Sequence, residues 1–365
     1  MIEFKSSSDP TIGVEIELQF IDVNTLDLKN LAPKVLSDID KKFSNRIKYE
    51  LFESMIEINT DICSNVAEVE RDITQSLNHL EEILKSYKAT LNCMSLHPFA
   101  KGKNQNISNN SRYQSIMQDL QIIGRRFITQ GLHVHIGVDD CEKVIRINNA
   151  LRIYLPLLLA LSTSSPFFEG DDTGLYSYRT KIFESLPLAG MPDYLNNWNH
   201  FEQLTTQLEK AGVIKSVKDL WWEVRPHPGF GTVEIRVCDI PVRLNEIFAL
   251  VSVIQALVIT IQNENNYPDT HIQILELNKW QAVRYGLEGV FVDPITLQKV
   301  TMRKAIDNLC KLIEPTMISL GLTKYVNIIE NILKKGTGAT TQRKLYNRSG
   351  KFEYIIQSLK EQFYQ

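Results

Sequence analysis

The fold is decided by residues 11–21, TIGVEIELQFI, in which apolar and polar side chains alternate. Successive side chains of a β-strand point to opposite faces of the sheet, so this period of two predicts a strand with one buried face and one polar face. The polar face carries Glu15, Glu17 and Gln19. We therefore expect a sheet that holds carboxylates close together on one side.

Three further segments alternate in the same way, at residues 49–60, 131–138 and 232–239. One such segment alone is most simply explained by a solvated strand face. All of them lack Lys on the polar face, however, and facing Glu side chains repel unless a positive charge lies between them. The polar faces carry Glu53, Glu57, His133, His135, Glu234 and Arg236, whereas Glu50 falls on the opposite face from Glu57.

A divalent cation is the simplest partner for such a face. The candidate ligands are carboxylate oxygens and an imidazole, without Cys, which suits Mg²⁺ or Mn²⁺ better than Zn²⁺. We therefore predict a metal site where the strands meet.

Several motifs resemble the type 2 glutamate-cysteine ligase family, also described as carboxylate-amine ligases. They include GVEIE at 13–17, GLHVHIGV at 131–138, WWEVRP at 221–226, GTVEIRVCD at 231–239 and NKWQAVRYG at 278–286. One departure is Ile16, where family members commonly carry Glu, but Ile16 belongs to the apolar face. The resemblance implies a single α+β catalytic domain over residues 1–365, with a curved, mainly antiparallel sheet backed by helices, similar to the catalytic domain of glutamine synthetase.

The resemblance also implies an activity, in which ATP activates a carboxylate as an acyl phosphate that an amine then attacks. The partners would be small-molecule amino-acid substrates, with glutamate and cysteine as the named pair, and the cofactors would be ATP and Mg²⁺ or Mn²⁺. Arg236 would act catalytically on the transferring phosphoryl group and contact the nucleotide. The candidate metal ligands are Glu15, Glu17, Glu53, Glu57, His133 and Glu234.

Five other residues have two possible roles each. His135 could contact nucleotide or be a hydrogen-bonded structural residue. Arg179 and Arg225 could hold the carboxylate of an amino acid, because a guanidinium binds that group in a bidentate manner, or they could form structural ion pairs. Trp221 and Trp222 could wall the substrate pocket or pack in the core.

Other functions remain open from sequence alone. A ligase of the same fold could join another carboxylate and amine, and no motif identifies the acceptor. A metal-dependent hydrolase could use the same residues to activate water without nucleotide. A non-catalytic metal- and nucleotide-binding protein is disfavoured, because a site released from catalysis should lose charges that are costly to hold together.

Composition fits an ordinary enzyme of 365 residues. The formal charge of −3 gives no electrostatic case for binding nucleic acid or an anionic membrane. Five scattered Cys without a C-x-x-C motif favour free thiols and a cytoplasmic location, and the first residues lack the apolar core of a signal peptide. Two apolar runs, at 151–161 and 247–261, are too short or interrupted to span a membrane and predict buried helices. A homodimer is expected because symmetric dimers are the commonest oligomers.

Apolar spacing of three and four residues predicts helices at 66–91, 142–162, 244–265, 271–285 and two within 301–334. Mobile loops are predicted at 101–111 and 336–350. Gly229 and Gly231 predict a turn into the fourth strand. Cys238 is expected on the polar face beyond Arg236, without a neighbour that would activate it.

Overall fold

The computed structural model describes residues 2–264, 267 and 269–364. Its centre is a seven-stranded sheet in which each pair of neighbouring strands is antiparallel. The α+β prediction is therefore confirmed, and all four alternating segments contribute to one sheet. In spatial order the strands are β2 (Ile47–Tyr49), β3 (Met55–Asn59), β1 (Ile12–Asp22), β5 (Leu132–Gly137), β9 (Thr232–Ile235) and β8 (Val224–His227), with β4 (Ala89–Asn92) also paired to β1.

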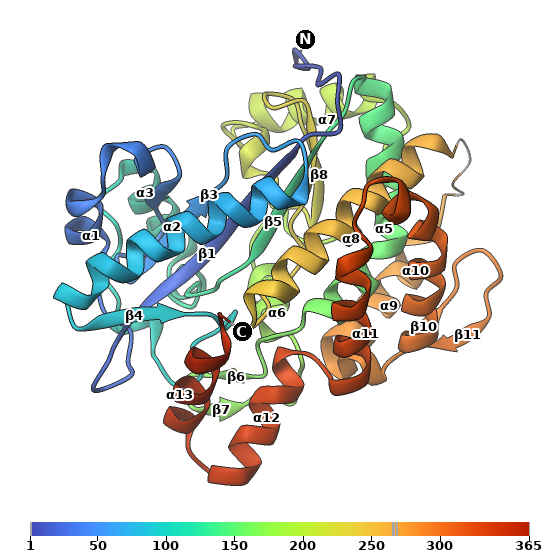
Figure 1. Cartoon of the computed structure of the whole chain (residues 1–365). Helices are drawn as coiled ribbons and strands as arrows, with labels where there is room; N and C mark the ends of the chain where they lie inside the picture. Colours follow the sequence, from blue (N-terminus) through green and yellow to red (C-terminus); the bar gives the residue numbers. More distant parts are fainter. Residues whose placement is uncertain (1, 265–266, 268, 365) are drawn as a thin grey trace.

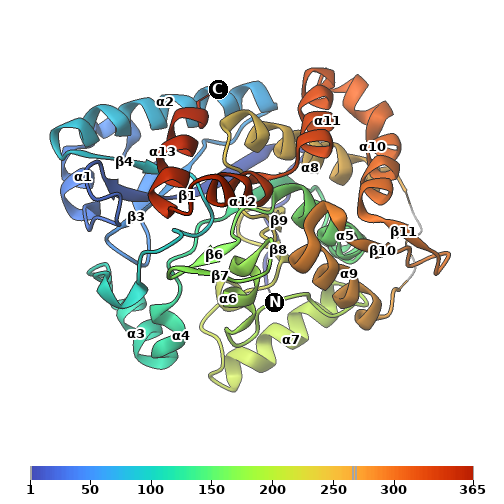
Figure 2. The same ribbon diagram turned by 90° about the horizontal axis from the view of Figure 1, so that it is seen from below.

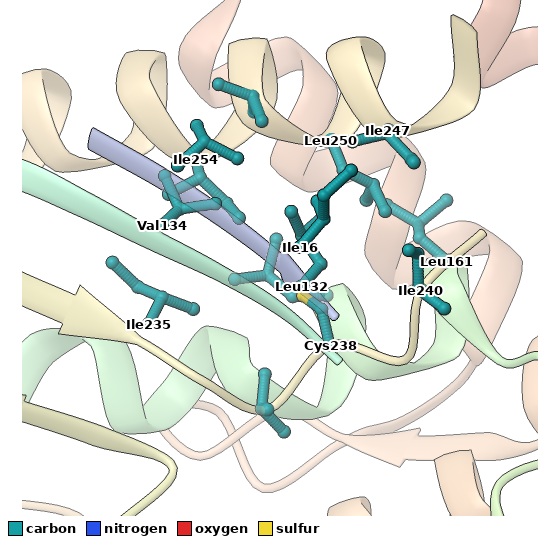
Figure 3. Close-up of a cluster of buried hydrophobic side chains, with 14 of the residues drawn as sticks. Ile16, Leu132, Val134, Leu161, Ile235, Cys238, Ile240, Ile247, Leu250 and Ile254 are labelled. Atoms are coloured by element: carbon teal, nitrogen blue, oxygen red, sulfur yellow. The ribbon is translucent and has the colours of Figure 1, made fainter. Parts of the chain in front are cut away.

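The apolar face of the sheet is covered by three long helices, α2 (Val66–Ser86), α5 (Cys141–Ser162) and α8 (Leu244–Asn263). Figure 1 shows α2 and α8 crossing this face, and Figure 2 shows α3, α4, α6 and α7 on the opposite side of the sheet. The close-up in Figure 3 shows the packing, in which Ile16 and Val134 of the sheet meet side chains of α8 such as Ile254. The alternation of β1 thus has the predicted physical cause, because its apolar row is fully buried.

Other helices and two small ribbons complete the chain. The helices predicted near 142–162, 271–285 and twice within 301–334 are confirmed. The helix predicted over 244–265 is α8, and its predicted end at Asn265 lies outside the described residues. These elements are α1 (Ala32–Asp38), α3 (Ser111–Leu120), α4 (Ile122–Arg125), α6 (Tyr178–Glu184), α7 (Trp198–Lys210), α9 (Ile272–Tyr285), α10 (Met302–Ser319), α11 (Val326–Lys335), α12 (Gly338–Ser349), α13 (Phe352–Gln362), β6 (Phe167–Phe168), β7 (Asp171–Asp172), β10 (Val290–Val292) and β11 (Lys299–Thr301).

Two element boundaries differ from the predictions. The helix predicted over 66–91 ends at Ser86, because the chain reverses at Lys88, whose φ is 50°, and Leu91 then belongs to β4. The predicted loop at 336–350 is mostly helix α12, whose buried Ala339 donates its N–H to the carbonyl of Thr163 at 2.9 Å. Tertiary contact rather than an apolar stripe holds this polar helix. The segment 101–111 is a loop with one short 3₁₀ turn before α3 begins at its last residue.

By length and composition, α5 and α8 are apolar enough to cross a membrane. In each, 89% of the most apolar 18-residue window is buried inside the fold, as expected for core helices.

A short segment, Lys5–Ser7, crosses the ends of β9 and β5. The N–H of Lys5 donates to the carbonyl of Pro228 at 3.0 Å, and that of Ser7 to Val138 at 2.9 Å. The predicted turn between β8 and β9 lies under this segment, where Gly231 has a φ of 65° and a Cβ would lie 1.5 Å from the carbonyl oxygen of Lys5. Only glycine fits there. The segment closes one end of the polar face.

Candidate active site

The polar face of the sheet is the floor of a cavity of about 310 Å³. Strand register brings the predicted residues together, because Glu15 lies opposite His133, Glu17 opposite Glu57, and His135 opposite Glu234. The predicted site residues that line the cavity are Glu15, Glu17, Glu57, His133, His135, Arg225, Glu234 and Arg236.

Glu50 and Glu53 are placed the other way round from the strand-parity prediction. Residues 49–60 are not one strand, since β2 ends at Tyr49 and β3 begins at Met55, and the turn between them resets the alternation. Glu50 therefore lines the cavity. Glu53 lies away from it, and its carboxylate accepts a hydrogen bond from Asn106 Nδ2 at 3.0 Å. The prediction that Glu50 lies on the opposite face from Glu57 is wrong, and Glu50 rather than Glu53 lines the cavity.

Burial and mutual repulsion raise the pKa values of the clustered carboxylates. Burial, followed by the charge of Glu234, raises the pKa of Glu15, and burial likewise raises the pKa of Glu17. The pKa of Glu50 lies well above its ordinary range, because of burial and the neighbouring Glu17. Burial and the charge of Glu15 raise the pKa of Glu57 to about 7. Without a bound cation, part of this cluster keeps its protons near neutral pH.

His133 has one engaged nitrogen and one free nitrogen. Its Nδ1 lies 2.5 Å from Oε1 of Glu15, whereas its Nε2 is buried with no hydrogen-bond partner among the described residues. Burial, followed by the nearby charge of Arg236, lowers the pKa of His133 to about 3, so the ring is neutral. With Nδ1 as the donor to Glu15, Nε2 presents a lone pair.

This donor set fits a divalent cation. Ligand atoms of Glu15, Glu17 and His133 lie within 4.8 Å of one another. Oxygen donors with one neutral imidazole suit Mg²⁺ or Mn²⁺, and the orphaned Nε2 of His133 is the kind of buried polar atom that needs such a partner. These residues are the ones that would hold the ion.

Glu234 anchors two arginines. Its Oε2 accepts from Nε of Arg225 at 2.7 Å, and its Oε1 accepts from Nη1 of Arg236. Burial opposes ionisation here, but the charges of Arg236 and Arg225 outweigh it and hold the pKa of Glu234 well below its ordinary range. Glu234 is therefore a permanent anion that orients Arg236 toward the cavity.

Arg225 is also fixed by the backbone. Its Nη1 donates to the carbonyl oxygens of Lys218 and Leu220 at 3.0 and 2.8 Å. These contacts match the structural ion-pair alternative for Arg225, and its contact with a substrate carboxylate stays a prediction.

Arg179 lies behind the cavity wall rather than on it. It is 2% exposed, its guanidinium lies 5.5 Å from the ring centre of Phe183, and its Nη1 lies 4.0 Å from Oδ1 of Asp239. A Cβ at Gly131 would lie 2.2 Å from Nη2 of Arg179. This placement again favours the structural alternative, with Arg179 joining α6 to the start of β5.

His135 lies at the other end of β5. Its Nδ1 is 3.0 Å from Oγ1 of Thr232, and its Nε2 is 3.8 Å from Glu234. Beside it, the exposed ring of Phe230 stacks on His227 with ring centres 4.1 Å apart. His135 and Phe230 also line a second cavity, which continues under the segment Lys5–Ser7.

Sequence reasoning missed Glu50 and the phenylalanines that line the cavity, although it named Trp221 and Trp222 as possible walls of the pocket. The Trp pair separates, since Trp221 lines the cavity while Trp222 packs against the core. Cys238 does not lie on the polar face. It is buried among core side chains (Figure 3), and burial raises the pKa of its thiol to about 12.

The sequence matches known ligases over almost its whole length. Residues 11–362 match the model of glutamate-cysteine ligase family 2, and the chain belongs to this family of amide-bond-forming ligases. A protein described as putative glutamate–cysteine ligase 2 from Gloeobacter violaceus is 39% identical over 364 residues, which cover 98% of each chain. A relative of the same description from Solibacter usitatus is 33% identical and covers 96% of this chain and 93% of its own.

Solved structures share the fold. Glutamate–cysteine ligase from Francisella tularensis, solved in complex with AMP, superposes with a TM-score of 0.73 at 14% identity and covers 99% of this chain and 90% of its own. A bifunctional glutathione synthetase from Pasteurella multocida gives a TM-score of 0.72 at 13% identity, covering 97% of this chain and 52% of its own.

Proposed function

We propose that this protein joins the γ-carboxylate of glutamate to an amine, using ATP and Mg²⁺ or Mn²⁺, through an acyl-phosphate intermediate. The observation that carries the proposal is the cluster of Glu15, Glu17, Glu50 and Glu57, which lines one cavity together with Arg236 and the orphaned Nε2 of His133. Glutamate and cysteine are the substrates in the names of the curated relatives, and they form the first pair to test.

The residues have distinct tasks in this reaction. A divalent cation, when bound, would offset the negative charge of the phosphate groups. Glu15, Glu17 and His133 would hold it, with Glu50 and Glu57 adjacent. Arg236, fixed by Glu234, supplies a positive charge beside the same cavity, where it stabilises the charge that develops during phosphoryl transfer.

The nucleotide base would lie at the His135 end of the cavity. Phe230 offers an exposed ring already stacked on His227, and aromatic stacking is a common way to hold a base. The complex of the Francisella ligase with AMP supports nucleotide use in this fold.

A phosphate-release assay tests the proposal. With ATP and Mg²⁺, we expect release that requires both a carboxylate donor and an amine, together with formation of the amide detected by mass. Hydrolysis of an amide by the metal-loaded protein without ATP would favour the hydrolase alternative. Binding of ATP without turnover on any amino-acid pair would favour the non-catalytic alternative. A cytoplasmic location and a homodimer stay predictions.

A further inference from the structure

One wall of the cavity is aromatic. The ring centre of Phe127 lies 5.3 Å from that of Phe183 and 5.7 Å from that of Trp221, and the latter two lie 5.9 Å apart. All three side chains are only partly buried and line the cavity, together with the apolar Leu51 and Ile116. Neither Phe183 nor Trp221 belongs to the hydrophobic core clusters of the described chain. Arg179 and Arg236 place their guanidinium groups 5.5 and 5.9 Å from the ring centre of Phe183, and the ring surface that still lines the cavity can accept an apolar group.

This wall lies at the opposite end of the cavity from the proposed base site. Phe183 is linked through Arg179 to Gly131, just before β5, whereas Phe230 contacts His135 with ring centres 5.7 Å apart. Gly131 and His135 are four positions apart along the chain, which is about 13 Å at the rise of a strand. The candidate metal ligand His133 lies between them. A nucleotide with its base at His135 and its phosphates over the metal ligands leaves the aromatic wall to the amino-acid substrates.

The two amino-acid substrates differ in what they need. The donor carries its reacting carboxylate to the metal ligands and Arg236, so its side chain is polar. The aromatic wall suits the side chain of the acceptor, because burying a ring against three rings removes a large apolar area from water. One methylene and a thiol, as in cysteine, would leave most of the wall exposed.

We infer that the acceptor amine carries an aromatic or bulky apolar side chain, which packs on Phe127, Phe183 and Trp221. This inference rests on the proposed function and names the acceptor class for the same site.

The experiment measures kcat/KM for acceptors with ATP, Mg²⁺ and glutamate held constant. Phenylalanine and leucine are compared with cysteine and alanine on the wild-type chain, and the amide products are identified by mass. We expect phenylalanine to exceed cysteine by about 10- to 100-fold, the range that burial of one large apolar side chain gives. Trp221→Ala should remove most of that preference, by lowering kcat/KM for phenylalanine far more than kcat/KM for alanine. Trp221→Leu keeps an apolar side chain in the wall. Its preference for phenylalanine over cysteine should therefore lie between those of the wild-type chain and Trp221→Ala.

Trp280→Ala is the matched control, because Trp280 is 41% exposed on α9, away from the cavity. It should leave the ratio of phenylalanine to cysteine unchanged. If the wild-type chain uses cysteine as well as it uses phenylalanine, the inference about the acceptor is overturned, while the proposed ligase function still stands. This outcome is read from the wild-type chain alone. A Trp221→Ala chain with weaker ATP binding and an unchanged acceptor ratio also overturns it, since the wall would then hold the base. Absence of phosphate release with every pair refutes the proposed function itself.

Discussion

Replacing Glu57 with glutamine should make the metal-free protein more stable and the enzyme inactive. The pKa of Glu57 is raised from 4.5 to about 7, and each pKa unit corresponds to about 1.4 kcal/mol. Full ionisation near pH 8 therefore costs the folded apoprotein about 3 kcal/mol. Part of this cost belongs to the neighbouring carboxylates and remains in the variant. We therefore expect Glu57→Gln to raise the free energy of unfolding of the metal-free protein by about 2 kcal/mol, which raises Tm by about 3 °C for a chain of this length.

The assay is thermal unfolding in EDTA beside phosphate release with Mg²⁺ and ATP. Glu57→Gln should lose at least about 100-fold in turnover, because one ligand-side charge is missing. Glu53→Gln is the matched control, since that carboxylate lies outside the cavity on Asn106, and it should change neither quantity much. Wild-type turnover in Glu57→Gln, or a lower Tm without metal, would refute the reasoning that this face is a charged metal site.

Three further results are expected. Arg236→Lys should lower kcat roughly 100-fold or more with little change in KM for ATP, because its charge acts mainly on the transition state; steady-state kinetics showing an unchanged kcat would make Arg236 structural. Glu50→Gln should reduce metal-dependent turnover far more than Glu53→Gln, and the reverse order would restore the strand-parity assignment. The apoprotein should lose stability as pH rises from about 4.5 through about 7, because the folded state binds the proton of Glu57 more tightly than the unfolded state, and Mg²⁺ should flatten this decline; equal denaturant midpoints at both ends would contradict the raised pKa.

The sheet and most of its charged face could be predicted because a strand has a strict period of two. Glu15, Glu17 and His133 lie within continuous strands, so their facing follows from position alone. Glu50 and Glu53 could not be assigned this way, because the turn between β2 and β3 contains neither Gly nor Pro to announce it.

The sequence indicated Trp221 as a possible pocket residue, but the aromatic wall as a whole could not be predicted, for a different reason. Phe127 follows a short helix, Phe183 lies on α6 and Trp221 precedes β8, so only tertiary packing brings their rings together. Helix α12 was missed for a similar reason, since its buried contacts with Thr163 replace the apolar stripe that sequence patterns detect.

The central position of β1 has a consequence for synthesis of the chain. During translation, β1 is synthesised long before β5, with which it pairs, and the segment that contains Lys5 is synthesised long before Gly231, against which it packs. Until β5 arrives, β1 has an unpaired edge of the kind that recruits strands from other chains. Charged side chains at such an edge discourage that association, so the carboxylates of Glu15 and Glu17 would protect the nascent protein from aggregation before they have any ligand to hold.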